Sequence, residues 1–147
     1  MIEERYLSAT QASSLRDEAH KIGQVDVIKA SGMSARNIAS TYLRLISKPT
    51  KEDMTRFYAA LLHFGESHKL ESVQESIVLA VEWLLDPRCK VCNGAGTILK
   101  KSKEHSCPKC KGAKFRKEPS HPTAFSLIDY VHKCRADYGG QMFKRLR

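Results

Sequence analysis

The apolar residues of the first 87 positions recur every three or four residues, with short polar interruptions between the runs. This spacing is typical of amphipathic helices that bury one face. Glycine, proline and capping residues divide the pattern into four segments. The predicted helices run from 8 or 13 to about 30, from 34 to 48, from 50 to 65 and from about 67 to 85.

Specific residues set the expected boundaries of these helices. Ser31-Gly32 forms a stop signal for the first helix, and Ser34 is the expected N-cap of the second. Thr50 is expected to cap the third helix, with Asp53 three residues later in the manner of a capping box.

A fifth helix is predicted from 120 or 123 to about 138, because its apolar residues lie largely on one side. Cys134 lies on that side and is expected to be a buried packing residue. Gly139-Gly140 is expected to end this helix, leaving a short basic segment over 141–147.

Between the fourth and fifth helices lie two Cys-x-x-Cys pairs, Cys89/Cys92 and Cys107/Cys110, separated by 14 residues. Each pair can turn two thiols toward one point, and four thiolates about 2.3 Å from a common ion form a tetrahedral zinc shell. A glycine two residues after each pair permits the positive φ of a tight turn. The pattern predicts one structural Zn²⁺ ion, with two disulfides or four free thiols as alternatives. A catalytic zinc is not expected, because four cysteines leave no position open for water.

These elements predict a mainly α protein. It is expected to be a helical bundle of about five helices with an inserted four-cysteine zinc-finger unit containing short β-strands. Within the unit, 97–99 and 114–116 are expected as strands and 103–106 as the turn that leads back. The predicted organisation has three parts: a helical body over 1–87, a zinc-binding insertion over 88–117, and a C-terminal helix over 118–147 that packs back on the body and ends in basic residues.

The charge of the chain is distributed unevenly. Residues 1–87 carry 10 lysines and arginines against 12 acidic residues, whereas residues 88–147 carry 15 against 4. The insertion alone has ten basic residues and one acidic residue. A basic cluster on a small rigid unit indicates a polyanionic partner such as nucleic acid, and a lysine-rich solvated loop is the alternative.

Residues 27–45 have the outline of a helix-turn-helix, in which the second helix enters the major groove of DNA. On this interpretation Arg36, Asn37 and Arg44 are candidate readers of bases or phosphates. The alternative is an ordinary corner between two helices of the body.

The residues around the cysteines resemble the late-gene antiterminator (Q protein) family of lambda-type phages. The resemblance covers about 88–131 and includes Cys89-Lys90-Val91-Cys92-Asn93-Gly94-Ala95-Gly96, followed by Cys107-Pro108-Lys109-Cys110-Lys111-Gly112-Ala113. It implies four cysteine zinc ligands between helices of a DNA-binding region. It also implies a factor that binds double-stranded DNA beside a late promoter and acts on host RNA polymerase that still holds its sigma factor. Such a factor then prevents termination.

For the contact with DNA, the resemblance indicates only the region of the chain. Within that region, we select candidate residues by their positive charge. These are Lys100, Lys101, Lys103, Lys114, Arg116 and Lys117. Longer members of that family continue well past the helix that follows the finger.

A second resemblance is to the zinc region of DnaJ-type chaperones, which is built on Cys-x-x-Cys-x-Gly-x-Gly. Residues 89–96 match this pattern in full, whereas Lys114 replaces the last glycine in 107–114. The chain has two such copies instead of four and no His-Pro-Asp tripeptide. A protein-binding zinc module and a plain DNA-binding transcription regulator are therefore the alternative functions. An enzyme is not expected, because phosphate-binding Gly-x-x-x-x-Gly-Lys and His-Glu-x-x-His motifs are absent.

No apolar run is long enough to span a membrane, and no small-molecule substrate is expected. The first five residues lack the basic start and apolar stretch of a secretory signal. Together with cysteine spacing typical of metal binding, this predicts a protein of the reducing cytoplasm, here that of a bacterial host.

Overall fold

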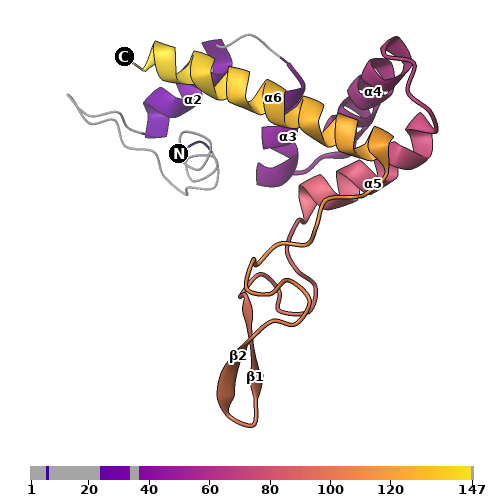
Figure 1. Cartoon of the computed structure of the whole chain (residues 1–147). Coiled ribbons are helices and arrows are strands. Elements are labelled where there is room, and N and C mark those ends of the chain that lie inside the picture. The colour runs from indigo at the N-terminus through magenta and orange to yellow at the C-terminus, as the bar shows by residue number, and fades with distance from the viewer. Residues whose placement is uncertain (1–5, 7–23, 34–36, 147) are drawn as a thin grey trace.

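The computed structural model describes Tyr6, residues 24–33 and residues 37–146. Helices make up most of this part, and the prediction of a mainly helical protein with a small strand-containing four-cysteine unit is confirmed (Figure 1). The described elements are α2 (Gln24–Met33), α3 (Ile38–Ser47), α4 (Lys51–Ser67), α5 (Val73–Leu85), β1 (Thr97–Lys100), β2 (Lys103–Ser106) and α6 (Pro122–Arg145). None of these helices has the length and apolarity needed to cross a membrane.

Helix α6 is the central helix, and α2, α3, α4 and α5 all pack against it (Figure 1). Its first half contributes Leu127, Ile128 and Val131 to a core shared with α3, α4 and α5. Its second half contributes Tyr138 and Met142 to a smaller core shared with α2 and α3. Because one helix serves both cores, the two ends of the helical body are fixed relative to each other.

The expected break at Gly139-Gly140 is wrong, because α6 continues to Arg145. Two glycines inside a helix cost about 2 kcal/mol relative to alanine. Tyr138 and Met142 are both buried, one on each side of the pair. The Tyr138 hydroxyl also donates to the carbonyl of Ser31 at 2.8 Å. Tertiary packing on both sides therefore outweighs the weak local preference.

The first predicted helix also ends later than expected, and Tyr138 is again involved. The described part of that helix, α2, passes through Ser31-Gly32 and ends at Met33. The Ser31 side chain lies 2.7 Å from the Tyr138 hydroxyl, so this serine makes a tertiary contact and does not stop the helix. The expected start at 8 or 13 lies outside the described residues.

Asn37, instead of Ser34, caps α3. Its side-chain oxygen accepts a hydrogen bond from the N–H of Ala39 at 2.8 Å, as in an N-cap. Ser34 itself lies outside the described residues. Thr50 caps α4 as expected, with its hydroxyl oxygen accepting from the N–H of Asp53 at 3.1 Å.

The junction between α4 and α5 differs from the prediction at both ends. Helix α4 passes through Gly65 to Ser67, and α5 begins only at Val73. The intervening turn contains Lys69 and Ser72 with φ of 52° and 48°. Gly65 lies against the Val73 side chain, where a Cβ atom would have no room. The glycine therefore serves helix packing and does not end the helix.

Strands β1 and β2 form an antiparallel hairpin, with Thr97 opposite Ser106 and Lys100 opposite Lys103. The expected turn over 103–106 is thus a strand. The turn itself is Lys101-Ser102, with φ of 49° and 61°, as in the type I′ turns that suit two-residue hairpins. The strand expected over 114–116 is reduced to a single bridge between Phe115 and Arg88.

The segment over 88–117 lies between α5 and α6, which pack against each other. Figure 1 shows the hairpin extending away from all the described helices. We call this segment the finger.

Candidate metal centre

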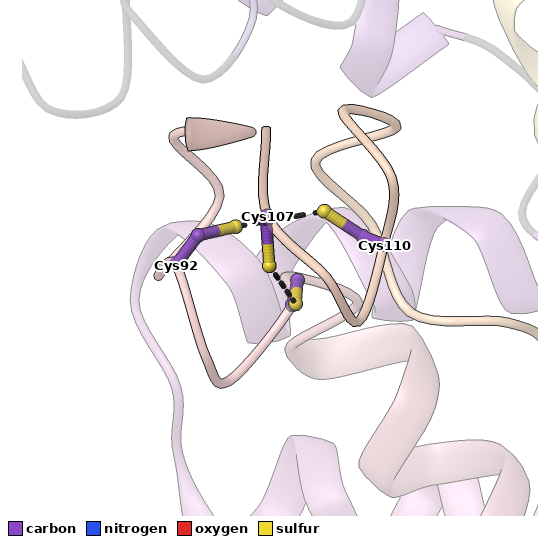
Figure 2. Close-up of side chains that lie close together, drawn as sticks. Cys92, Cys107 and Cys110 are labelled. Atoms are coloured by element: carbon purple, nitrogen blue, oxygen red, sulfur yellow. Dashed lines mark hydrogen bonds between the residues drawn. The ribbon is translucent and has the colours of Figure 1, made fainter. Parts of the chain in front are cut away.

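The four predicted cysteine ligands converge on one point. All four Sγ atoms lie within 4.8 Å of one another. Sγ of Cys89 is 3.8 Å from that of Cys107, and Sγ of Cys92 is 3.7 Å from that of Cys110. Figure 2 shows the side chains of Cys92, Cys107 and Cys110 pointing toward one another.

These separations exclude one of the alternatives that the sequence leaves open. A disulfide requires sulfur atoms about 2.0 Å apart, so none of the four cysteines is bridged. A tetrahedron with ligand bonds of about 2.3 Å has edges of about 3.8 Å, which the observed distances match. The thiols therefore fit a four-thiolate metal centre.

The shell is closed by protein. Cys89, Cys92 and Cys107 are buried, and only Cys110 is partly exposed. Four protein ligands leave no position for a reactive water molecule, so the arrangement suits a structural ion.

The finger is built from two equivalent loops. Each residue of the first loop has a counterpart 18 positions later, beginning with Cys89 and Cys107. Ala95 donates its N–H to the carbonyl of Cys92 at 2.9 Å, and Ala113 donates to the carbonyl of Cys110 at the same distance. The φ values follow the same order: Asn93 48°, Gly94 83° and Gly96 84° in the first loop, and Lys111 50°, Gly112 86° and Lys114 70° in the second.

The two loops are also bonded to each other reciprocally. The N–H of Cys107 donates to the carbonyl of Gly96, and the N–H of Cys89 donates to the carbonyl of Lys114, both at 2.9 Å. The finger thus has an internal pseudo-twofold symmetry with the four sulfurs at its centre. Symmetric closure brings the ligands together through backbone bonds as well as through any bound ion.

Backbone N–H groups also point at the sulfurs. The N–H of Gly96 donates to Sγ of Cys92 at 3.3 Å. Burial raises the pKa of Cys92, but backbone donors led by Gly96 outweigh it and lower this pKa to about 7. A hydrogen bond from the N–H of Cys92 is the main cause of the lowered pKa of Cys89.

Cys110 behaves in the opposite way, because burial raises its pKa to about 11. In the absence of a cation, the thiols of Cys92 and Cys110 therefore do not ionise alike. A divalent ion bound among them would favour the thiolate form of all four.

The basic residues of the finger fall into two groups. Arg88 and Lys90 pair with Asp86, and Arg116 pairs with Glu82, so all three bind the end of α5 or the residue after it. Within the described part of the chain, the other seven form no ion pair, and all of them are exposed. These free lysines are Lys100, Lys101, Lys103, Lys109, Lys111, Lys114 and Lys117.

Because three of the basic residues are paired, the set of candidate DNA-binding residues differs from the one predicted from the sequence. Arg116 is engaged at the base of the finger: its guanidinium donates to the side chain of Glu82 at 3.0 Å and to the carbonyl of Glu82 at 2.8 Å. Lys109 and Lys111 were not nominated, although they are exposed and free of ion pairs. The sequence positions of both residues could have signalled this, because Lys109 lies between the two cysteines of the second pair and Lys111 follows that pair directly, on the outside of a turn whose thiols face inward.

The candidates on the possible helix-turn-helix are placed differently. Asn37 caps α3 and donates its side-chain amide to the carbonyl of Cys134 at 3.2 Å. Arg44 donates to the carboxylate of Asp53 at 3.0 Å. No residue of α3 is fully exposed. Arg36 lies outside the described residues.

Comparison of the chain with family models, with curated proteins and with solved structures finds no significant match. No relative therefore contributes to the functional assignment.

Proposed function

We propose that this protein is a non-catalytic transcription regulator that contacts nucleic acid through its finger. The observation that carries the proposal is the set of seven exposed lysines without ion-pair partners in the described residues, on a unit that extends away from the body (Figure 1). Uncompensated lysines on a rigid support are suited to neutralising phosphates.

The ion that organises the finger is proposed to be a single Zn²⁺. Zinc favours closed tetrahedral shells of four thiolates and supplies folding free energy to small units. The four cysteines would hold it. Iron binds similar shells, so metal analysis of the purified protein is the direct test, with one zinc per chain expected.

The specific regulatory role rests on the family resemblance. We propose that the protein binds double-stranded DNA near a late promoter in the cytoplasm of a bacterial host, engages RNA polymerase and its sigma factor, and allows transcription through terminators. In-vitro transcription through a terminator, on a template that carries the upstream DNA, tests this. Read-through that increases only when the protein is present supports antitermination, whereas altered initiation without read-through indicates a plain regulator.

The contribution of the finger to DNA binding can be isolated by matched charge changes. Lys100, Lys101 and Lys103 at the hairpin are changed together to glutamine, and three exposed body lysines, Lys48, Lys51 and Lys69, are changed in the control. Both variants lose the same charge. The hairpin variant is expected to bind DNA at least tenfold more weakly and to have a shallower salt dependence, because fewer counterions are released. Equal effects of the two triple changes would overturn the assignment to the finger.

Loss of the metal should remove the same activity. Cys107→Ser is expected to abolish metal binding and DNA binding together, because the lysines lose their support. DNA binding retained by a metal-free variant would contradict this role of the finger.

A protein-binding module is the second candidate, because the finger also exposes apolar side chains. Val91, Leu99 and Phe115 are 55%, 79% and 55% exposed. Capture of purified RNA polymerase, compared with capture of unfolded model proteins, distinguishes a transcription factor from a chaperone-like module. A DNA-independent preference for unfolded chains would favour the latter.

A further inference from the structure

One side of the finger contains a groove of about 540 Å³ beside the second cysteine loop. Lys109 and Lys111 contribute from the loop, and Phe115 and Lys117 from the segment that leads to α6. Cys89 and Cys110 also line it, so the groove adjoins the candidate metal centre. The lining contains no acidic residue. The hairpin lysines do not line it, so the groove is separate from the surface at the tip of the hairpin.

Phe115 gives this groove a feature that phosphate binding alone does not require. Its side chain is 55% exposed although it is aromatic. The backbone beneath it is fixed, because Phe115 bridges to Arg88 and the N–H of Arg116 donates to the carbonyl of Pro87 at 2.9 Å. Trp83 also donates to the carbonyl of Arg116 at 3.3 Å. The ring is therefore presented to solvent from a rigid support.

We propose that this groove binds single-stranded nucleic acid, with one base stacked on Phe115 and the flanking phosphates on Lys109, Lys111 and Lys117. An aromatic ring among free cations is the usual arrangement for binding single strands, because every unpaired base offers a face to stack on. A base within a duplex has both faces covered by its neighbours and cannot stack on a side chain.

The inference rests on the proposed function and adds a division of labour. The hairpin lysines contact duplex phosphates, and the groove holds an unpaired strand. The charge of the groove favours a polyanion over an apolar peptide, because an apolar peptide would leave its lysines without partners.

The test uses the full-length, metal-loaded protein and fluorescence anisotropy with four labelled probes. These are a thymidine octamer, a uridine octamer, an abasic octamer with the same phosphates, and a 20-base-pair duplex. Phe115→Leu keeps an apolar side chain but removes the aromatic face, and Phe115→Tyr retains the face. Because Phe115 is exposed, both variants should fold, which metal content and circular dichroism verify.

Phe115→Leu is expected to weaken binding of the thymidine or uridine octamer about tenfold or more. Phe115→Tyr should bind like the parent protein. The abasic octamer and the duplex should be bound within about twofold of the parent by both variants. The thymidine and uridine arms distinguish a DNA strand from an RNA strand.

Three results would overturn the inference. The first is equal binding of the base-containing and abasic octamers. The second is an unchanged affinity in Phe115→Leu, and the third is equal binding of a glutamate decamer. Any of these with duplex binding intact leaves the proposed function standing, whereas loss of both single-strand and duplex binding by the parent protein refutes the proposed function itself.

Discussion

Gly96 and Lys114 occupy equivalent positions in the two cysteine loops, with φ of 84° and 70°, and the carbonyl of each accepts a hydrogen bond from a cysteine of the other loop. Glycine adopts this conformation without penalty, whereas a residue with a Cβ atom is strained there. The two halves of the finger therefore have the same backbone geometry, but the half that contains Lys114 is more strained than the half that contains Gly96.

Exchanging residue types at these positions should shift stability in opposite directions. Lys114→Gly is expected to raise the free energy of unfolding by up to about 1 kcal/mol, since relief of strain exceeds the added chain entropy. Gly96→Ala is expected to lower it by about 1–3 kcal/mol. Its Cβ would also lie 3.1 Å from the carbonyl oxygen of Gly112. Urea denaturation of the metal-loaded protein measures both.

Gly140→Ala provides the control for these changes. Gly140 lies inside α6, and a Cβ built there meets nothing within 4 Å. The change should therefore stabilise the protein by about 1 kcal/mol through helix propensity. If Gly96→Ala stabilised the protein as much as Gly140→Ala does, the claim that the loop requires glycine would be wrong.

The convergence of the four cysteines could be predicted from the sequence because most of the information is local. Two residues between cysteines let one tight turn aim both thiols at one point, and two such turns supply the four ligands of a zinc shell. The reciprocal bonds from Cys89 to Lys114 and from Cys107 to Gly96 could not be predicted in this way. They join positions that are distant along the chain, and the repeated cysteine pattern does not by itself show which backbone groups of the two loops pair.

The helices could be predicted in type, and several of their ends could not. Gly65 and Gly139-Gly140 carry the ordinary signals of a helix end, yet α4 and α6 pass through them. In each case a residue of another helix decides: Val73 of α5 at the first glycine, and Ser31 of α2 near the second. Local preference is a weak guide wherever the core fixes both flanks of a glycine.

The attachment of the finger to the body depends on Arg116. The guanidinium donates to both the side chain and the carbonyl of Glu82. Arg116→Ala should lower the free energy of unfolding by about 1–2 kcal/mol, because it removes two charge-assisted hydrogen bonds at a partly exposed position. Glu82→Gln should cost less, about 0.5 kcal/mol, since the carbonyl bond remains.

Hydrogen exchange of the backbone amides at 115–118 gives a second measurement for Arg116→Ala. Exchange at these amides should accelerate, while metal content stays at the parental level. Arg88→Gln is the control, because Arg88 is largely exposed where it pairs with Asp86 and should change neither quantity appreciably. If exchange at these amides were unchanged in Arg116→Ala, the guanidinium would not contribute to holding the finger on the body.

The carboxylate of Asp53, in the first turn of α4, makes the stability of the fold depend on pH. Burial raises the pKa of Asp53, but hydrogen bonds from the Thr50 hydroxyl and the Arg44 guanidinium outweigh it and hold the pKa below its usual range. A pKa that is lower in the folded than in the unfolded state stabilises the fold above about pH 4. That stabilisation is lost as the pH falls through the folded-state pKa.

Asp53→Asn should therefore cost about 1–2 kcal/mol at pH 7 and progressively less below pH 4. Urea denaturation at a series of pH values gives the difference between parent and variant. Loss of metal in acid affects both proteins alike, because Asp53 lies in the helical body, so it cancels from the comparison. A difference that stays constant from pH 7 to pH 3 would exclude the ionised carboxylate as the cause.

Gly65 and Val73 should be coupled, because the Val73 side chain occupies the space that a Cβ at Gly65 would fill. Gly65→Ala gains about 1 kcal/mol of helix propensity but overpacks the contact between α4 and α5, which costs about 1–3 kcal/mol. We expect Gly65→Ala to lower the free energy of unfolding, and Val73→Ala to lower it by about 1 kcal/mol. In the double variant only the Cβ of residue 73 remains near the added methyl group, at 3.3 Å, so most of the overpacking is relieved and the variant should be about as stable as Val73→Ala alone. Denaturation of all four proteins gives the coupling energy, expected at about 1 kcal/mol or more. Simple additivity would mean that α4 and α5 adjust their spacing, and that Gly65 is not required for their packing.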